Sequence, residues 1–150
     1  MFSTYEEFIK KEIESFKSYG VFYDMAIRYV PYFFQLLCKI LDMKNISYES
    51  RIRINCALAY LVVENDVLPE NIYGAEGYMD DLFVLVYVLK ELLPKHKDIM
   101  KTQWLNMIPT EFNNKDLESA LNDCYAISMK VLTERKIVDE TLEFAGLKKA

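Results

Sequence analysis

The sequence predicts an all-α protein: a compact, single-domain bundle of five to seven helices around a buried apolar helical hairpin. Glycine and proline number only four each among 150 residues, too few for a chain built on many tight turns. Apolar side chains recur at steps of three and four residues along most of the chain, which is the period of an amphipathic helix. A chain of 150 residues can enclose one core and is short for two, so residues 1–150 form one domain.

The first helix is predicted over residues 5–19. Ser3 and Thr4 followed by Glu6 and Glu7 resemble a capping box, in which a hydroxyl and a carboxylate satisfy early backbone amides. Gly20 is a natural stop for this helix. Its apolar face is formed by Tyr5, Phe8, Ile9, Ile13, Phe16 and Tyr19.

Residues 21–43 are apolar and aromatic, with Pro31 in their middle. Proline lacks an amide hydrogen and disfavours a helical residue before it, so a kink or break is expected near Tyr29 and Val30. A turn at residues 44–47 separates this segment from a helix over residues 48–63. The apolar face of that helix is predicted from Ile52, Cys56, Ala59, Tyr60 and Val63.

The helix predicted over residues 79–92 contains LFVLVYVL and is apolar on every side. Such a helix is either fully buried or in lipid. Spanning a bilayer takes roughly 20 apolar residues, and Lys90, Glu91 and Pro94 close this run well before that length. We therefore expect it to be the central, most buried helix.

Beyond Pro94 the chain predicts a helix over residues 95–107 that carries the only tryptophan, Trp104. Pro109 ends that segment. Asp116 and Glu118 then fall in the first turn of another helix, where the helix dipole favours carboxylates. A short last helix over residues 138–144 ends at Gly146.

Negative charge is concentrated between Ile54 and Leu89. This stretch holds six acidic residues and no lysine or arginine, a formal charge of −6 in a chain whose net charge is −5. The acidic residues are Glu64, Asp66, Glu70, Glu76, Asp80 and Asp81. They gather around a predicted loop over residues 64–78, so this loop is the candidate functional feature.

A family resemblance rests on the same stretch. The residues that carry it are ALAYL at 57–61, Asp66, Leu68-Pro69, Gly77-Tyr78 and Asp80-Asp81. Their order and spacing resemble the YkvA-like family, small bacterial proteins with a domain of unknown function. The resemblance implies a helical core over residues 30–93, with residues 95–150 as a helical extension, and implies no activity.

The acidic residues allow three interpretations. In the structural one, Asp66 caps the turn before Pro69, while Asp80 and Asp81 beside Gly77 cap the buried helix and complement its dipole. In the second, the outward acids Glu64, Glu70 and Glu76 bind a partner. In the third, Asp66, Glu70, Asp80 and Asp81 hold a divalent cation, because hard cations take several oxygen ligands. Their spacing is not that of a calcium loop, and we expect no cofactor.

One basic residue is predicted to pair with this cluster. If residues 21–43 and 48–63 form an antiparallel hairpin, Asp66 lies level with the neighbourhood of Arg28. Carboxylates beside an apolar core need a partner to stay charged. We therefore expect Arg28 to approach Asp66, Asp80 or Asp81.

Several chemistries find no support in the sequence. His96 is the single histidine and is expected to be exposed, so one chain cannot assemble a Ser-His-Asp array or a histidine metal cluster. Cys38, Cys56 and Cys124 are widely separated and are predicted to be reduced thiols, at least two of them buried. The isoelectric point of about 5.0 disfavours nucleic acid, and Arg51 and Arg53 are interpreted as a solvated helix face.

These observations favour a non-enzymatic interaction or regulatory protein, of the size and acidity of immunity proteins, antitoxins or defence-system subunits. It would present the acidic loop to a protein partner with a basic or apolar surface. The alternative is a membrane-peripheral accessory protein, and a carboxylate-based metal protein is the third hypothesis. Residues 1–20 are charged and lack the apolar core of a signal peptide, so a cytoplasmic location is expected.

Overall fold

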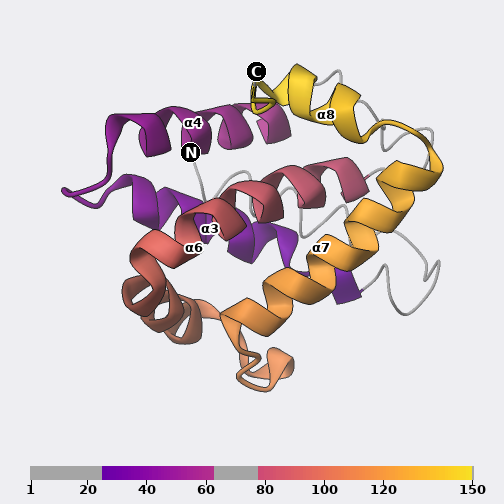
Figure 1. Ribbon diagram of the computed structural model, residues 1–150. Helices are drawn as coiled ribbons and strands as arrows, with labels where there is room; N and C mark the ends of the chain where they lie inside the picture. The colour runs from indigo at the N-terminus through magenta and orange to yellow at the C-terminus, as the bar shows by residue number, and fades with distance from the viewer. Residues whose placement is uncertain (1–24, 63–77, 150) are drawn as a thin grey trace.

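The computed structural model describes residues 25–62 and 78–149, and every regular element among them is helical (Figure 1). The predicted all-α bundle is therefore confirmed. In chain order the elements are α3 (Val30–Leu41), α4 (Tyr48–Val62), α6 (Met79–Met107), the 3₁₀ turn η2 (Thr110–Phe112), α7 (Leu117–Glu134) and α8 (Val138–Ala145). None of the described helices is both long enough and apolar enough to cross a membrane.

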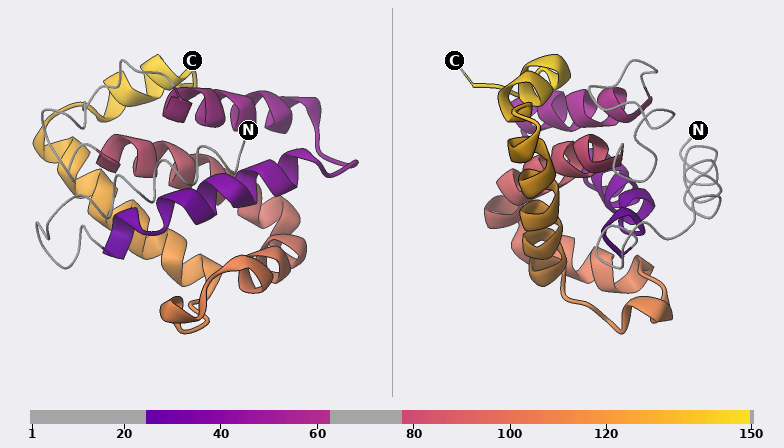
Figure 2. Two further views of the ribbon diagram at one scale, coloured as in Figure 1. Left: turned by 180° about the vertical axis from the view of Figure 1, so that it is seen from behind. Right: turned by 90° about the vertical axis from the view of Figure 1, so that its right-hand side faces the viewer.

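The first half of α6 is the centre of the bundle. It packs against α3, α4, α7 and α8, and its residues 79–86 are all buried. Figure 2 shows α3 and α7 on opposite sides of α6, with α4 and α8 along a third side. This confirms the predicted central helix. A helix that is apolar on every side is most stable when neighbouring helices shield every side from water.

Helix α3 begins where Pro31 predicts. Tyr29 precedes it as the N-cap residue, after a turn in which the Tyr29 amide donates to the Ala26 carbonyl at 3.1 Å. Proline is tolerated in the first helical turn because the amide it lacks would have no partner inside the helix. Eight of the twelve residues in α3 are buried, so this helix is covered on more than one side, as expected.

The predicted inward face of α4 was wrong at Ile52 and Ala59, and Val63, also assigned to it, lies outside the described residues. The structure buries Ile54, Ala57, Leu58 and Leu61, and leaves Ile52 and Ala59 exposed. Tyr60 is buried as predicted, and Cys56 is half-buried. Both faces of α4 carry apolar residues, so its three- and four-residue steps fit more than one register.

Helix α6 bends near Pro94, where the sequence predicts two helices. His96 has a non-helical backbone with φ −136° and ψ 33°, and it is half-buried rather than exposed. Proline lacks an amide hydrogen and its ring clashes with the preceding turn, which accounts for the bend. The bend turns the second half of α6 back along the base of the bundle (Figure 1).

An aromatic cluster fixes that second half against α3. Trp104 is fully buried and its indole nitrogen donates to the Lys115 carbonyl at 2.8 Å. Its ring stacks on Phe33, with ring centres 5.2 Å apart, while Tyr29 stacks on Phe112 at 4.6 Å. Stacked aromatic pairs add to the stabilisation from burial, so the cluster joins the helical extension to the core.

The last two helices end the bundle as the sequence predicts. Asp116 caps α7 by accepting a hydrogen bond from the Ser119 amide at 3.3 Å. Gly146 ends α8 with a left-handed backbone, φ 78°, which glycine adopts without strain. No disulfide joins the three cysteines; Cys38 and Cys124 are buried, as expected.

Candidate functional site

Most residues of the predicted acidic site lie outside the described residues. These are Glu64, Asp66, Pro69, Glu70, Glu76 and Gly77. The structure describes the two ends of the segment that holds them: the C-terminal end of α4 and the first turn of α6. The site is therefore described from Tyr60 on one side and from Asp80 and Asp81 on the other.

Asp80 and Asp81 occupy the first turn of α6 and are both fully buried. The first helical turn exposes unsatisfied amide hydrogens and a partial positive charge, so it favours acidic side chains. The N-cap residue, Tyr78, makes no side-chain cap hydrogen bond. The two acidic residues therefore lie in the first helical turn, as predicted, and inside the core rather than at its surface.

Tyr60 holds Asp80 in place. The Tyr60 hydroxyl donates to Oδ2 of Asp80 at 2.5 Å, and both residues are buried. A short hydroxyl–carboxyl hydrogen bond of this kind satisfies a polar group that would be costly to bury alone. It connects α4 with the start of α6 across 20 residues of sequence. We call this Tyr60–Asp80 pair the clasp.

The described part of the structure records no ion pair of Arg28 with Asp80 or Asp81, and the predicted pairing of Arg28 with Asp66 stays a prediction. Arg28 is exposed beside the start of α3, and among the described residues it forms no ion pair. Asp66, the remaining predicted partner, lies outside those residues. The predicted hairpin gives the height of Arg28 along residues 21–43 but not the direction of its side chain. Arg28 lies in the turn before Val30, and its side chain is exposed to solvent.

Arg51 and Arg53 are not a solvated helix face, which corrects a second prediction. Arg51 donates to the carbonyl oxygens of Leu41 and Met43, both at 2.9 Å. It thereby donates to carbonyl groups at the C-terminal end of α3, where a helix has no backbone donors of its own to pair with them. Nothing local in the sequence indicates this partner, because it depends on the turn between α3 and α4.

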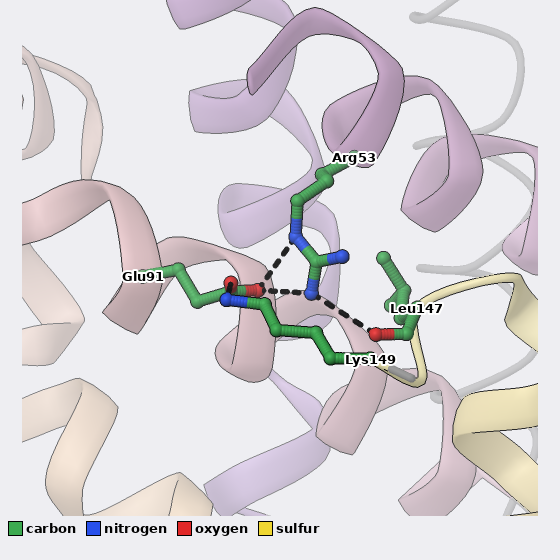
Figure 3. A network of polar contacts seen from close by, with 4 residues as sticks. All are labelled: Arg53, Glu91, Leu147 and Lys149. Atoms are coloured by element: carbon green, nitrogen blue, oxygen red, sulfur yellow. Dashed lines mark hydrogen bonds and ion pairs between the residues drawn. The ribbon is translucent and has the colours of Figure 1, made fainter. Parts of the chain in front are cut away.

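Arg53 in α4 connects the segment after α8 with α6 (Figure 3). Its guanidinium donates to Oε1 of Glu91 at 2.6 Å and to the Leu147 carbonyl at 3.1 Å, and Lys149 lies 3.2 Å from Oε2 of Glu91. A shallow pocket of about 190 Å³ opens here, bordered also by Glu49 and Lys95. Arg53, Glu91 and Lys149 line this pocket, and Arg53 and Lys149 both already form ion pairs with Glu91. We therefore assign these residues a structural role.

The described residues bear only in part on the metal interpretation. They contain no group of three or more side chains from histidine, cysteine, aspartate and glutamate arranged to hold a metal ion. Asp66 and Glu70, which that interpretation also requires, are outside them. It therefore stays a hypothesis to be tested by adding the metal.

Exposed apolar side chains gather on the α4 and α8 side of the molecule. Among the described residues, four of the seven exposed large hydrophobic side chains lie there: Tyr48, Ile52, Val62 and Phe144. Scattered exposed hydrophobic residues are ordinary, but several on one side indicate a binding surface. Composition and periodicity did not reveal this surface, since they assigned Ile52 to the core.

Phe144 lies on the clasp from outside. Its ring meets the Tyr60 ring edge to face, with centres 5.9 Å apart, while about half of the Phe144 side chain stays exposed. Exposed acids accompany it on α8: Asp139, Glu140 and Glu143. We call these four residues the α8 patch. It adjoins the end of α4 that leads into the acidic segment 64–77.

Comparison with known proteins gives one family model and one relative of this chain. A family model described as "Protein of unknown function (DUF1232)" matches residues 50–87. The "Uncharacterized protein ORF9" of Methanothermobacter thermautotrophicus is 29% identical over 124 residues, covering 82% of this chain and 80% of that protein. No solved structure matches the chain. The matched model span contains Tyr60, Asp80 and Asp81, so the clasp lies inside it.

Proposed function

We propose that this chain is a YkvA-like, non-enzymatic interaction or regulatory protein of the cytoplasm. Its acidic segment, together with the α8 patch, receives a protein partner that has a basic and apolar surface. Glu64, Glu70 and Glu76 are the partner-binding acids in this proposal. The helical bundle supplies a rigid support for them.

The α8 patch is the observation that supports the proposal most directly. A half-exposed aromatic ring beside exposed carboxylates suits a partner that offers both an apolar side chain and a positive charge. Glu143 also pairs with Lys148 at 2.9 Å, but both side chains are largely exposed, so the pair is weak. A basic partner can therefore compete for this carboxylate.

The clasp divides the acids of the sequence into two kinds. Asp80 and Asp81 are buried at the start of α6, where they serve the fold. Since they are enclosed, the partner-binding role is assigned to Glu64, Glu70 and Glu76, which lie between them and α4 in the sequence. The six acidic residues of this stretch thus need not act as one cluster.

A binding experiment with defined peptides tests the proposal. One peptide is an amphipathic helix of leucine and lysine, and its counterpart carries glutamate in place of every lysine. Fluorescence anisotropy should show binding of the lysine peptide alone, weakened at least tenfold by the triple substitution E64K/E70K/E76K. The matched control D98K/E111K/E134K changes three exposed acids on other elements by the same total charge. Equal weakening by both triples would reduce the effect to net charge and contradict the proposal.

The membrane-peripheral alternative draws on the exposed apolar side chains of α4. Co-sedimentation with phosphatidylcholine vesicles distinguishes it, because lipid binding through an apolar face should persist in E64K/E70K/E76K. Sedimentation of the wild-type protein with these vesicles, together with no binding of the lysine peptide, would replace the proposed function by this alternative.

A further inference from the structure

The outward face of α4 is an uncharged helical stripe. Tyr48, Ile52, Asn55, Ala59 and Val62 are all exposed, and they follow one another at steps of four, three, four and three residues. We call them the α4 stripe. This alternation is the seam spacing along which two helices pack together. Charged residues make up 27% of the chain, yet none occupies this solvent-facing stripe.

The exposure of the stripe is substantial. Tyr48 is 79% exposed, Ile52 45% and Val62 58%. The opposite side of the same helix, with Ile54, Ala57 and Leu61, is already packed in the core. The stripe is therefore a second, largely apolar face that the helices described in residues 25–62 and 78–149 do not cover.

We propose that the α4 stripe is a self-association surface, on which a second copy of this chain packs with its α4 antiparallel. The two-fold axis passes beside Asn55. Asn55 lies seven residues from both Tyr48 and Val62, so it is the midpoint of the stripe. The proposal does not depend on the proposed partner function.

The order of side-chain sizes along the stripe favours a second copy over an unrelated helix. An isologous interface opposes each residue to its counterpart across the axis. About Asn55, the large Tyr48 then meets the smaller Val62 of the second copy. Ile52 meets Ala59 of the second copy within one residue, about 1.5 Å along the helix. Each bulky residue thus faces a smaller one.

Asn55 suits the position on the axis. A side-chain amide both donates and accepts, so two asparagines that face each other can satisfy one another. A single polar residue in such a seam also sets the register, because any slip leaves its amide unpaired. The antiparallel register about Asn55 follows from this pairing.

The charges beside the stripe are compatible with this arrangement. Glu49 and Arg51 flank the stripe on its two sides, six and four residues from Asn55. The two-fold axis therefore separates the two Glu49 by about 18 Å and the two Arg51 by about 12 Å along the helices, each beyond the Debye length of about 8 Å at physiological salt. Helix α4 has a formal charge of +1 in a chain of −5, so this face approaches its copy with less repulsion than the acidic remainder.

The contact area predicts a weak dimer. Stable interfaces bury about 800 Å² on each partner, and one four-turn stripe supplies less. We therefore expect dimerisation in the micromolar range.

Sedimentation equilibrium between about 1 and 300 µM protein tests the proposal. The wild-type chain should dimerise, and Ile52→Glu should weaken the dimer at least thirtyfold by placing a charge in the seam. Ile99→Glu is the matched control, since Ile99 is 41% exposed on α6 and lies outside the stripe. Ala59→Glu is a second disrupting variant, and circular dichroism confirms that each variant is folded.

Cysteine cross-linking tests the register in a C56A background. Asn55→Cys should form a disulfide-linked dimer under mild oxidation, whereas Leu105→Cys, 48% exposed on α6, should not. Tyr48→Cys should cross-link to Val62→Cys in a mixture but not to itself. The proposal would be overturned by a wild-type chain that is monomeric throughout, or by a dimer that Ile52→Glu and the control Ile99→Glu weaken equally. Cross-linking of Tyr48→Cys to itself would also overturn it. Vesicle binding by a monomer would show that lipid covers the stripe instead.

Discussion

Helices α4 and α6 are both rich in apolar residues, yet the fold uses them differently. The first half of α6 is enclosed on every side, with residues 79–86 all buried. Helix α4 buries one face and exposes Tyr48, Ile52 and Val62 on the other. An apolar run therefore does not by itself indicate a core element. A face of a helix becomes part of the core only where another element of the same chain packs against it.

The largest expected effect comes from two phenylalanines, one in each environment. Phe83 in α6 is fully buried, whereas Phe144 on α8 is half-exposed. Phe83→Ala should lower the free energy of unfolding by about 3 to 5 kcal/mol, because it removes buried contacts and leaves a cavity. Phe144→Ala should cost less than about 1 kcal/mol. Urea denaturation measures both, and similar losses would contradict the assigned burial.

Next in size is the clasp between the two helices. Asp80→Ala should cost about 1 to 3 kcal/mol, because it removes the acceptor of Tyr60 from a buried site and a carboxyl group from the helix start. Tyr60→Phe tests the same bond, and a double-mutant cycle isolates the pair. If Asp80→Ala is neutral while millimolar calcium or magnesium raises the wild-type melting temperature by several degrees, a metal site replaces the clasp.

The Arg53 network should have a smaller effect on stability. Arg53→Ala removes hydrogen bonds to Glu91 and to the Leu147 carbonyl, and is expected to cost about 1 to 2 kcal/mol. Lys97→Ala is a suitable control, since its pair with Glu118 at 3.5 Å is exposed and should contribute under about 0.5 kcal/mol. Limited proteolysis should also cut the C-terminal segment faster in Arg53→Ala. Equal stability of the two variants would show that the network is dispensable.

The last expected effect is absent near neutral pH and appears only in alkaline solution. Burial, reinforced by the charge of Asp123, raises the pKa of the Cys124 thiol to about 12, and burial raises the pKa of Tyr29 to about 12. Both groups lose their proton at lower pH in the unfolded chain than in the folded one. Their contribution is thus fully present below about pH 9, the ordinary range for these groups, and is lost as pH rises toward 12.

Melting temperatures between pH 8 and 11 test this expectation. The wild-type value should fall over this range, and the fall should be shallower in Cys124→Ala and in Tyr29→Phe, measured against each variant's own value at pH 8. Cys56→Ala is the control, because Cys56 is half-buried. An equal slope in all four proteins would show that neither buried group contributes.

Much of the fold could be predicted from local chemistry. Pro31 and Pro94 mark the start of α3 and the bend in α6, because each lacks the amide hydrogen that a continuing helix needs. Gly146 ends α8 for a similarly local reason. Local chemistry predicted less of the candidate site. Its buried acids were identified, but Tyr60 was assigned to a core face and to the family motif without a partner, and Phe144 was not singled out.

The sequence by itself determined that the chain is helical, where most helices begin and end, and that α6 is central, since periodicity, caps and an all-round apolar run depend on near neighbours. Only the tertiary structure decided which face of α4 is buried, because both faces fit the helical period. It also decided the partners of Arg51, Arg53 and Asp80, which come from other elements. A side-chain hydrogen bond depends on separations of a few ångströms, and packing of distant helices sets those separations.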